Sequence, residues 1–319
     1  MYLLKRNISW FVAFVLAVII VGGYEVLFAA PANFPAGSIT SIEKGASAPA
    51  AAQELVAAHI IKHPLVLLFV LRVIGKSTSV QAGAYLFKTP QNVFTVANRL
   101  VTAAYDLPPA RITFVEGATV REMAAQVADM LPTIPVKDFL ARGQSFEGYL
   151  FPDTYFFSPS ADAASIIKIV RANFDTKISV LSTDIQTSGH SLSDIVIMAS
   201  LVEKEARTSA VRHLVAGILW NRLRLKMPLQ VDAVFGYIYN RETYSPSFED
   251  LKVDSPYNTY THIGFPPGPI NNPGLDSLDA AVHPTKTDYL FYLTDKNGVM
   301  HYATTFAGHQ ANQRKYLGN

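Results

Sequence analysis

The sequence IMASLVEKEA, residues Ile197–Ala206, is the most informative stretch for the fold of its domain. A run of apolar side chains is followed directly by the carboxylates of Glu203 and Glu205. Ser191, followed three residues later by Asp194, is typical of a helix start, where a hydroxyl caps free amides and an acid meets the positive end of the dipole. Apolar residues then recur at helical spacing, namely Ile195, Ala199, Val202 and Ala206. The sequence therefore predicts a helix over about 191–206 that buries one face.

Glu203 lies on the flank of that buried face, so we expect its carboxyl group to sit half out of water. Partial desolvation favours the protonated form of a carboxyl group, and a proton kept near neutral pH can be donated by a general acid. Glu205 leaves the helix about 200° away and is expected to point elsewhere. The alternative is a surface helix edge whose acids pair with Lys204 or Arg207.

A second helix follows, indicated by the apolar residues Leu214, Val215, Ile218, Leu219 and Leu223. It is predicted to end at Arg224, Lys226 and Pro228, where cations precede a helix breaker. Beyond it, residues 255–260 and 264–274 contain too much Pro and Gly for a helix or a central strand. A long irregular loop inside a compact domain is usually functional, so we expect this one to form a binding wall.

Six sequence blocks between residue 146 and the C-terminus occur in an order that resembles one protein family. They are EGYLFPDTY (147–155), LVEKE (201–205), NRL (221–223), LQVD (229–232), SPYNTY (255–260) and GFPPGPI (264–270). The combination resembles the endolytic murein transglycosylases, also called YceG-like proteins. The resemblance implies an α+β chain with a membrane anchor, a LysM-like region and a catalytic domain, and it places the essential glutamate at Glu203.

The activity implied by the resemblance is endolytic cleavage of peptidoglycan without water. Glu203 would protonate the oxygen between N-acetylmuramic acid and the next N-acetylglucosamine. It would then take a proton from the muramic acid C6 hydroxyl as that oxygen closes a 1,6-anhydro ring. An intramolecular nucleophile has a large effective concentration, so a second catalytic carboxylate can be dispensed with. The family is associated with termination of nascent strands.

Further site residues are chosen by polarity and by the family blocks. Candidates for holding the sugar are Gln230, Asp232, Tyr257, Asn258, Thr259 and Asn272, and candidates for support are Glu205, Arg222 and Glu147. No metal or cofactor is expected. Two alternatives stay open: a hydrolase that pairs Glu203 with a second carboxylate from Glu147, Asp153 or Asp232, and a non-catalytic wall-binding protein.

The N-terminus predicts where this chemistry happens. Residues 7–24 contain no charge, and a membrane span needs about 20 such residues. Lys5 and Arg6 precede this run, which favours a cytoplasmic tail at 1–7, an anchor at 8–30 and an extracytoplasmic remainder at the bacterial cytoplasmic membrane. The alternative is a cleaved signal peptide ending near Ala30-Pro31-Ala32.

Between anchor and catalytic domain, residues 36–132 are interpreted as a LysM-like α+β region, and residues 133–319 as the catalytic domain. Turns that end in Ser47 and Thr119 each lead into an amphipathic helix, and residues 82–87 read as a strand. Residues 64–74 are too few for a membrane span and predict a buried helix. A plain spacer is the alternative to a glycan-binding region. Residues 289–294 and 299–304 predict a hairpin.

Composition excludes several function classes. A formal net charge of +2 over 319 residues gives no support for nucleic-acid binding. The absence of cysteine removes disulfides, zinc-thiolate sites and thiol catalysis. The resemblance implies peptidoglycan strands and cell-wall synthesis enzymes as partners, and the uncharged N-terminal run adds the membrane.

Overall fold

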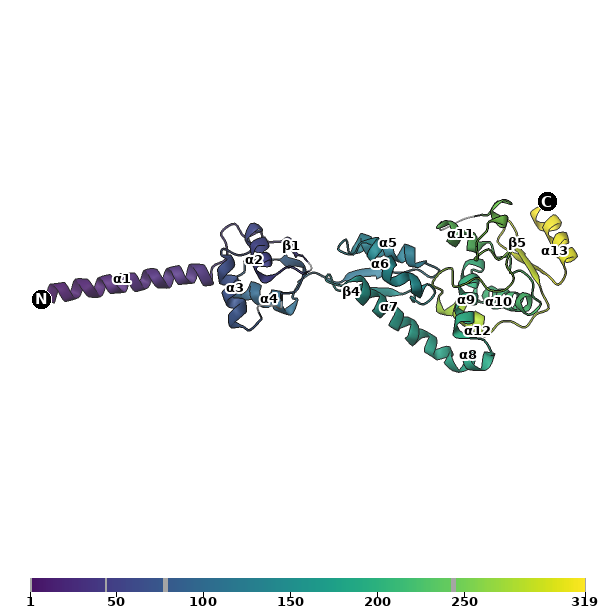
Figure 1. The fold of residues 1–319 in the computed structure, drawn as a ribbon, viewed down its shortest axis with the longest axis horizontal. Coiled ribbons are helices and arrows are strands. Elements are labelled where there is room, and N and C mark those ends of the chain that lie inside the picture. The colour runs from purple at the N-terminus through teal and green to yellow at the C-terminus, as the bar shows by residue number, and fades with distance from the viewer. Residues whose placement is uncertain (1, 44, 77–79, 242–244, 319) are drawn as a thin grey trace. The chain divides into compact units, whose positions relative to one another are not determined.

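The computed structural model describes residues 2–43, 45–76, 80–241 and 245–318 (Figure 1). The chain forms two compact units. Unit 1 comprises Met1–Ala110 with Ser158–Ser160, and unit 2 comprises Arg111–Phe157 with Ala161–Asn319. Both units mix helices with short two-stranded sheets, so the predicted α+β class is confirmed.

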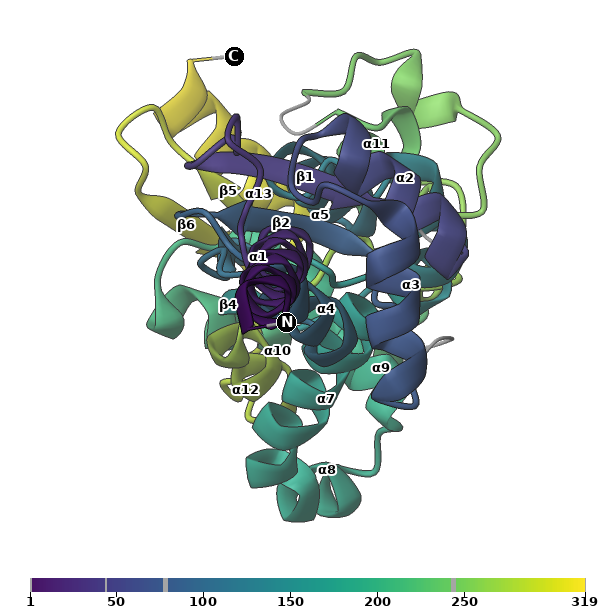
Figure 2. The same cartoon turned by 90° about the vertical axis from the view of Figure 1, so that its left-hand side faces the viewer.

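Unit 1 packs helices beside one antiparallel strand pair, and its first helix extends away from them (Figure 1 and Figure 2). Its strands pair from Ser38↔Phe87 to Ile42↔Gly83, and its core holds Leu55, Leu67 and Phe87. Its elements are α1 (Tyr2–Leu27), β1 (Ser38–Ile42), α2 (Ala48–Ala57), α3 (Pro64–Val73), β2 (Gly83–Phe87) and α4 (Val93–Thr102).

The first part of unit 2 consists of a strand pair, β3 with β4, and the helices packed near it. Its elements are β3 (Ala110–Thr113), α5 (Val120–Met130), α6 (Val136–Gly143), the 3-10 turn η1 (Gln144–Phe146), β4 (Thr154–Phe157), α7 (Ala163–Ile178), the 3-10 turn η2 (Ser179–Leu181) and α8 (Ser182–Ser188).

The second part of unit 2 is built around α9 (Leu192–Glu205). Its other elements are α10 (Ser209–Arg224), α11 (Ala233–Tyr239), η3 (Asp250–Lys252), α12 (Leu275–Val282), β5 (Phe291–Thr294), β6 (Met300–Ala303), α13 (Phe306–Asn312) and the π-helical turn η4 (Gln313–Leu317). The predicted hairpin is confirmed, with Phe291 opposite Ala303. The Pro- and Gly-rich segments after residue 254 form irregular backbone, as expected.

Helix α9 is more deeply placed than its pattern indicated. The predicted capping box is present, because Ser191 and Asp194 exchange side-chain and backbone hydrogen bonds. However, every residue from Ile195 to Val202 is buried, and not one face alone. A helix that is apolar on all sides belongs in the centre of a domain, and here α10 and α12 pack against it. Glu203 and Glu205 follow directly after this buried segment.

Two features differ from the expectations, and the membrane anchor stays a prediction. Residues 111–132 belong to unit 2, because β3 pairs with β4 and α5 packs on α6, so the compact units divide at Ala110 and not at 132. Helix α3 is only half buried. Helix α1 covers the segment predicted as an anchor, and among the described residues no helix combines the length and hydropathy of a membrane span.

Candidate active site

A polar cavity of about 680 Å³ opens in unit 2 where the C-terminal end of α9 meets α5 and α11. That volume is in the range of ligand-binding sites. Its lining residues are Thr119, Arg121, Glu122, Gln144, Glu147, Lys204, Glu205, Asp232, Ala233, Gly236, Tyr237, Asn240, Arg241, Ser245 and Ile270. Three of the predicted site residues, Glu147, Glu205 and Asp232, thus share one cavity.

Glu205 is a carboxyl group of this cavity whose pKa is raised. Burial raises its pKa from 4.5 to about 7, opposed by the hydrogen bond that Tyr292 donates to it. The Tyr292 hydroxyl lies 2.9 Å from Glu205 Oε2 and comes from strand β5, so the hairpin and the end of α9 build the site together. A carboxyl group in this state can hold a proton at neutral pH and give it up to a substrate oxygen.

Glu147 is a second buried carboxyl group on the cavity wall. It accepts hydrogen bonds from the backbone amide of Val120 at 3.1 Å and from Asn272 Nδ2 at 3.0 Å. Burial raises its pKa to about 8 despite these two donors. The next residue, Gly148, has φ +84° and packs so closely on Pro269 that a side chain there would overlap the ring. Glu147 therefore ties α5 to the loop before α12.

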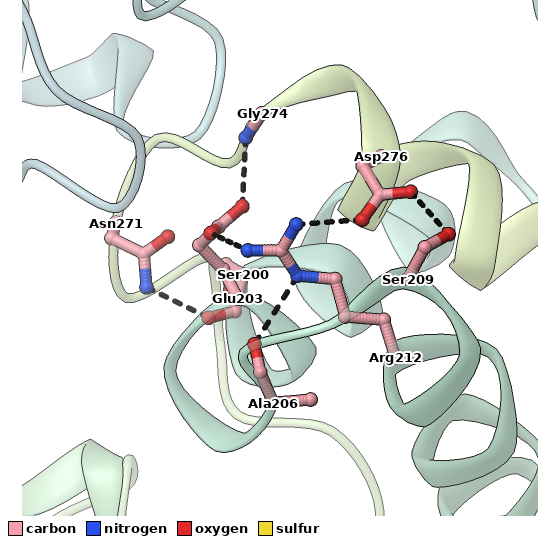
Figure 3. Close-up of polar contacts among 8 residues, drawn as sticks. All are labelled: Ser200, Glu203, Ala206, Ser209, Arg212, Asn271, Gly274 and Asp276. Atoms are coloured by element: carbon pink, nitrogen blue, oxygen red, sulfur yellow. Dashed lines mark hydrogen bonds and ion pairs between the residues drawn. The ribbon is translucent and has the colours of Figure 1, made fainter.

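Glu203 lies elsewhere, in an ion-pair network that Figure 3 shows. Its carboxylate accepts from Arg212 Nη2 at 2.8 Å and from the Gly274 amide at 2.9 Å, and its side chain is 5% exposed. Arg212 also contacts Asp276 at 2.6 Å and the Ala206 carbonyl oxygen at 3.2 Å. The expectation of a half-exposed Glu203 is thus replaced by a buried, paired one.

This network fixes the turn that carries Glu205. Arg212 links α10 to the end of α9 and to α12, and Glu203 links α9 to the Gly274 amide at the start of α12. A Cβ atom at Gly274 would overlap the carboxyl group of Glu116, whose pKa is raised by burial and by the negative charge of Glu203. Glu203 is absent from the cavity lining, so its contacts are those of a residue that positions others.

The remaining predicted residues mostly hold backbone. Asn258, Thr259 and Asn272 are buried, and they bond to Leu251, Val231 and Ala118 respectively. They therefore present no surface to a sugar in this structure, and their role here is to shape the irregular loop. Their side-chain amides and hydroxyls satisfy buried loop backbone here, and a direct contact with substrate stays a prediction.

Arg222, Gln230 and Tyr257 also lie outside the cavity lining. Arg222 is buried, donates to the carbonyl oxygens of Leu229 and Leu290, and has its pKa lowered by burial. Gln230 is exposed, with φ +52°, and accepts from Arg222. Tyr257 packs against Tyr237, with ring centroids 5.0 Å apart, and Tyr237 is the member of that pair that reaches the cavity.

Comparison with known proteins shows the family of this chain. The model of the YceG-like family matches residues 40–315. The chain belongs to the YceG-like family. It is 31% identical over 306 residues to a Bacillus subtilis protein named endolytic murein transglycosylase, covering 88% of this chain and 84% of that protein.

Two further matches extend the YceG-like assignment. A Streptococcus pneumoniae protein of the same name is 28% identical over 95% of this chain, which spans 64% of its length. The crystal structure of a yceG-like protein from Listeria monocytogenes is 27% identical, with a TM-score of 0.60 over 86% of this chain and 98% of that one.

Two residues that the site of this YceG-like chain uses escape prediction from the sequence. The hairpin pattern gives Tyr292 no role beyond packing, yet its hydroxyl contacts Glu205 across 87 positions of sequence. Arg212 belongs to none of the sequence blocks, although its place nine residues after Glu203 makes it a testable partner for that carboxylate. Each pairing joins two separate elements of the fold. The i, i+3 and i, i+4 spacings of a single helix therefore could not predict it.

Replacing Glu147 with Gln should flatten the pH dependence of stability. Glu147 and Glu205 have folded-state pKa values above their ordinary values, so the native state binds more protons between pH 4.5 and about 8. Stability therefore falls as pH rises through this window, and a tenfold difference in proton affinity between the folded and unfolded states corresponds to about 1.4 kcal/mol. Glu147→Gln keeps an acceptor for the Val120 amide. The part of the pH dependence of unfolding free energy that comes from Glu147 should be lost.

Urea unfolding at pH 5 and pH 8, followed by Trp220 fluorescence in a Trp10→Phe background, measures this slope. Trp220 lies in unit 2, where its indole donates to the Ala281 carbonyl oxygen. Glu249→Gln is the matched control, because Glu249 is a surface acid paired with Lys252. An unchanged slope in Glu147→Gln would show that Glu147 does not titrate in this window.

Proposed function

We propose that this chain is a membrane-anchored peptidoglycan lytic transglycosylase. It cleaves the bond between N-acetylmuramic acid and N-acetylglucosamine within glycan strands and leaves 1,6-anhydro ends. The named relatives support the reaction class. The observation that carries the site assignment is a protonatable carboxyl group, Glu205, on the wall of a polar cavity large enough for sugar residues.

Glu205, and not Glu203, is the general acid of this proposal. Glu203 is held in an ion pair with Arg212 and accepts from the Gly274 amide, and it does not line the cavity. Glu205 faces the cavity and has a pKa of about 7 because it is buried. The two residues stand two positions apart, so one helix end supplies both a positioning ion pair and an acid.

The proposed reaction uses Glu205 twice. Its carboxyl proton goes to the glycosidic oxygen as the bond to the anomeric carbon breaks. The resulting carboxylate then accepts the proton of the muramic acid C6 hydroxyl, whose oxygen attacks the anomeric carbon and closes the anhydro ring. The Tyr292 hydroxyl stabilises the carboxylate between these steps, since it donates to Glu205. The proton balance closes, so the enzyme is ready for another strand.

The other parts of the chain fit this proposal. Helix α1 contains the uncharged run 7–24 and would hold the enzyme at the outer face of the bacterial cytoplasmic membrane. Unit 1 places β1 and β2 on either side of α2 and α3 in sequence, which resembles a LysM arrangement and would suit glycan binding. Release of nascent strands beside wall synthesis enzymes would follow from that location.

Product analysis tests the proposed function. The purified chain is incubated with isolated glycan strands, and the new ends are identified by mass spectrometry. Anhydro ends at internal positions are expected. Reducing ends would instead indicate a hydrolase, for which Glu147 is the available second carboxyl group, and binding without cleavage would indicate a wall-binding protein.

A further inference from the structure

Helix α3 presents an apolar stripe to the outside of unit 1. Leu65, Phe69 and Val73 recur every four residues, and they are 75%, 63% and 68% exposed. The opposite face of the helix, with Leu67 and Leu71 fully buried, forms part of the core. Large apolar side chains gathered on one exposed helix face usually mark a binding surface. These three side chains are not part of the core of unit 1.

The charged residues within the segment that carries this stripe are all basic. From Lys62 to Lys76 the sequence contains no acidic residue, and Arg72 and Lys76 are both exposed near the C-terminal end of α3. An apolar stripe with cations beside it is the pattern of a helix that lies in the plane of a membrane interface. Anionic headgroups attract such cations, and the acyl boundary receives the apolar side chains.

The stripe lies on the same unit as the exposed apolar surface of α1. The Lys62 ammonium pairs with Glu25 at 2.9 Å, only two residues before α3 begins. Phe28 stacks on Phe94 with centroids 5.4 Å apart, and Val66 of α3 lines a small cavity together with Val26. Along α1 itself, large apolar side chains such as Ile20 are exposed.

We propose that α3 lies in the interfacial layer of a lipid bilayer that contains anionic lipids. Leu65, Phe69 and Val73 enter the acyl boundary, while Arg72 and Lys76 contact headgroup phosphates. The occupant is lipid because the flanking cations of the stripe complement an anionic leaflet, and because the start of α3 contacts the C-terminal end of α1, the helix proposed as the membrane anchor. Unit 1 is then held against the membrane by a second contact, independently of the reaction that unit 2 catalyses.

Site-specific quenching tests the proposal, and the absence of cysteine allows a single label. The full chain carries one fluorophore on Phe69→Cys and is reconstituted into nanodiscs of equal parts phosphatidylcholine and phosphatidylglycerol. The discs contain a lipid with a nitroxide at a shallow acyl position. The matched control is Ile39→Cys on β1, another apolar residue of unit 1 that is 58% exposed. Quenching at position 69 should be several-fold stronger than at position 39.

Two further measurements test whether anionic headgroups take part in the contact. Arg72→Gln with Lys76→Gln, or discs of phosphatidylcholine alone, should reduce quenching at position 69, with cooperative melting unchanged. Equal quenching at 69 and 39 overturns the proposal. Protection of position 69 from aqueous iodide before any lipid is added also overturns it, because a protein surface would then cover the stripe. Neither result depends on transglycosylase activity.

Discussion

Glu205→Gln should lower the rate of strand cleavage by about 10²- to 10⁴-fold, the range for loss of a general acid and base. Glutamine has the same shape and can still accept from Tyr292, so folding should survive. It has no proton to transfer at any accessible pH. The measurement is the release of anhydro-ended fragments from glycan strands under single-turnover conditions.

Glu203→Gln is the matched control for this result. Its amide oxygen can still accept from Gly274 or Arg212, and Asp276 still pairs with the guanidinium, so the positioning network is weakened but not removed. Activity should fall far less than in Glu205→Gln. The wild-type rate should also decline as pH rises through about 7, since Glu205 then loses its proton. An inactive Glu203→Gln beside an active Glu205→Gln would return the catalytic role to Glu203.

Arg212→Met should destabilise unit 2 by about 3 kcal/mol. The Arg212 side chain is 13% exposed, and its removal leaves the buried carboxylate of Glu203 without a counter-charge. Removing one member of a buried ion pair costs about 3–5 kcal/mol, because the other charge stays desolvated. The partial exposure of Asp276 places the expectation at the low end of that range. Urea unfolding followed by Trp220 fluorescence measures the loss.

The double variant Arg212→Met with Glu203→Met separates charge from packing. It should recover part of the lost stability, because no unpaired Glu203 carboxylate remains. Lys252→Met is the surface control: Lys252 and Glu249 are both largely exposed, and such pairs contribute less than about 1 kcal/mol. A double variant less stable than Arg212→Met alone would show that the network acts through packing and not through charge compensation.

Much of unit 2 could be predicted from local sequence. The start of α9 at Ser191, the end of α10 at Arg224 and the C-terminal hairpin depend on caps, periodicity and turn residues within a few positions of each other. The family blocks likewise identified the segment that carries the acid. The sequence alone does not show which of the two glutamates lines the cavity, because both stand at the C-terminal end of the same buried helix.

The sequence by itself determined the α+β class, the family and the motif that contains the acid, since these depend on residues near one another in the chain. Only the tertiary structure decided how the two glutamates differ. Arg212, nine residues after Glu203, and Gly274, 71 residues after it, bond the first glutamate, while Tyr292 and burial prepare the second. A carboxyl group's protonation depends on the charges, donors and desolvation around it, and these come from segments that only folding brings together.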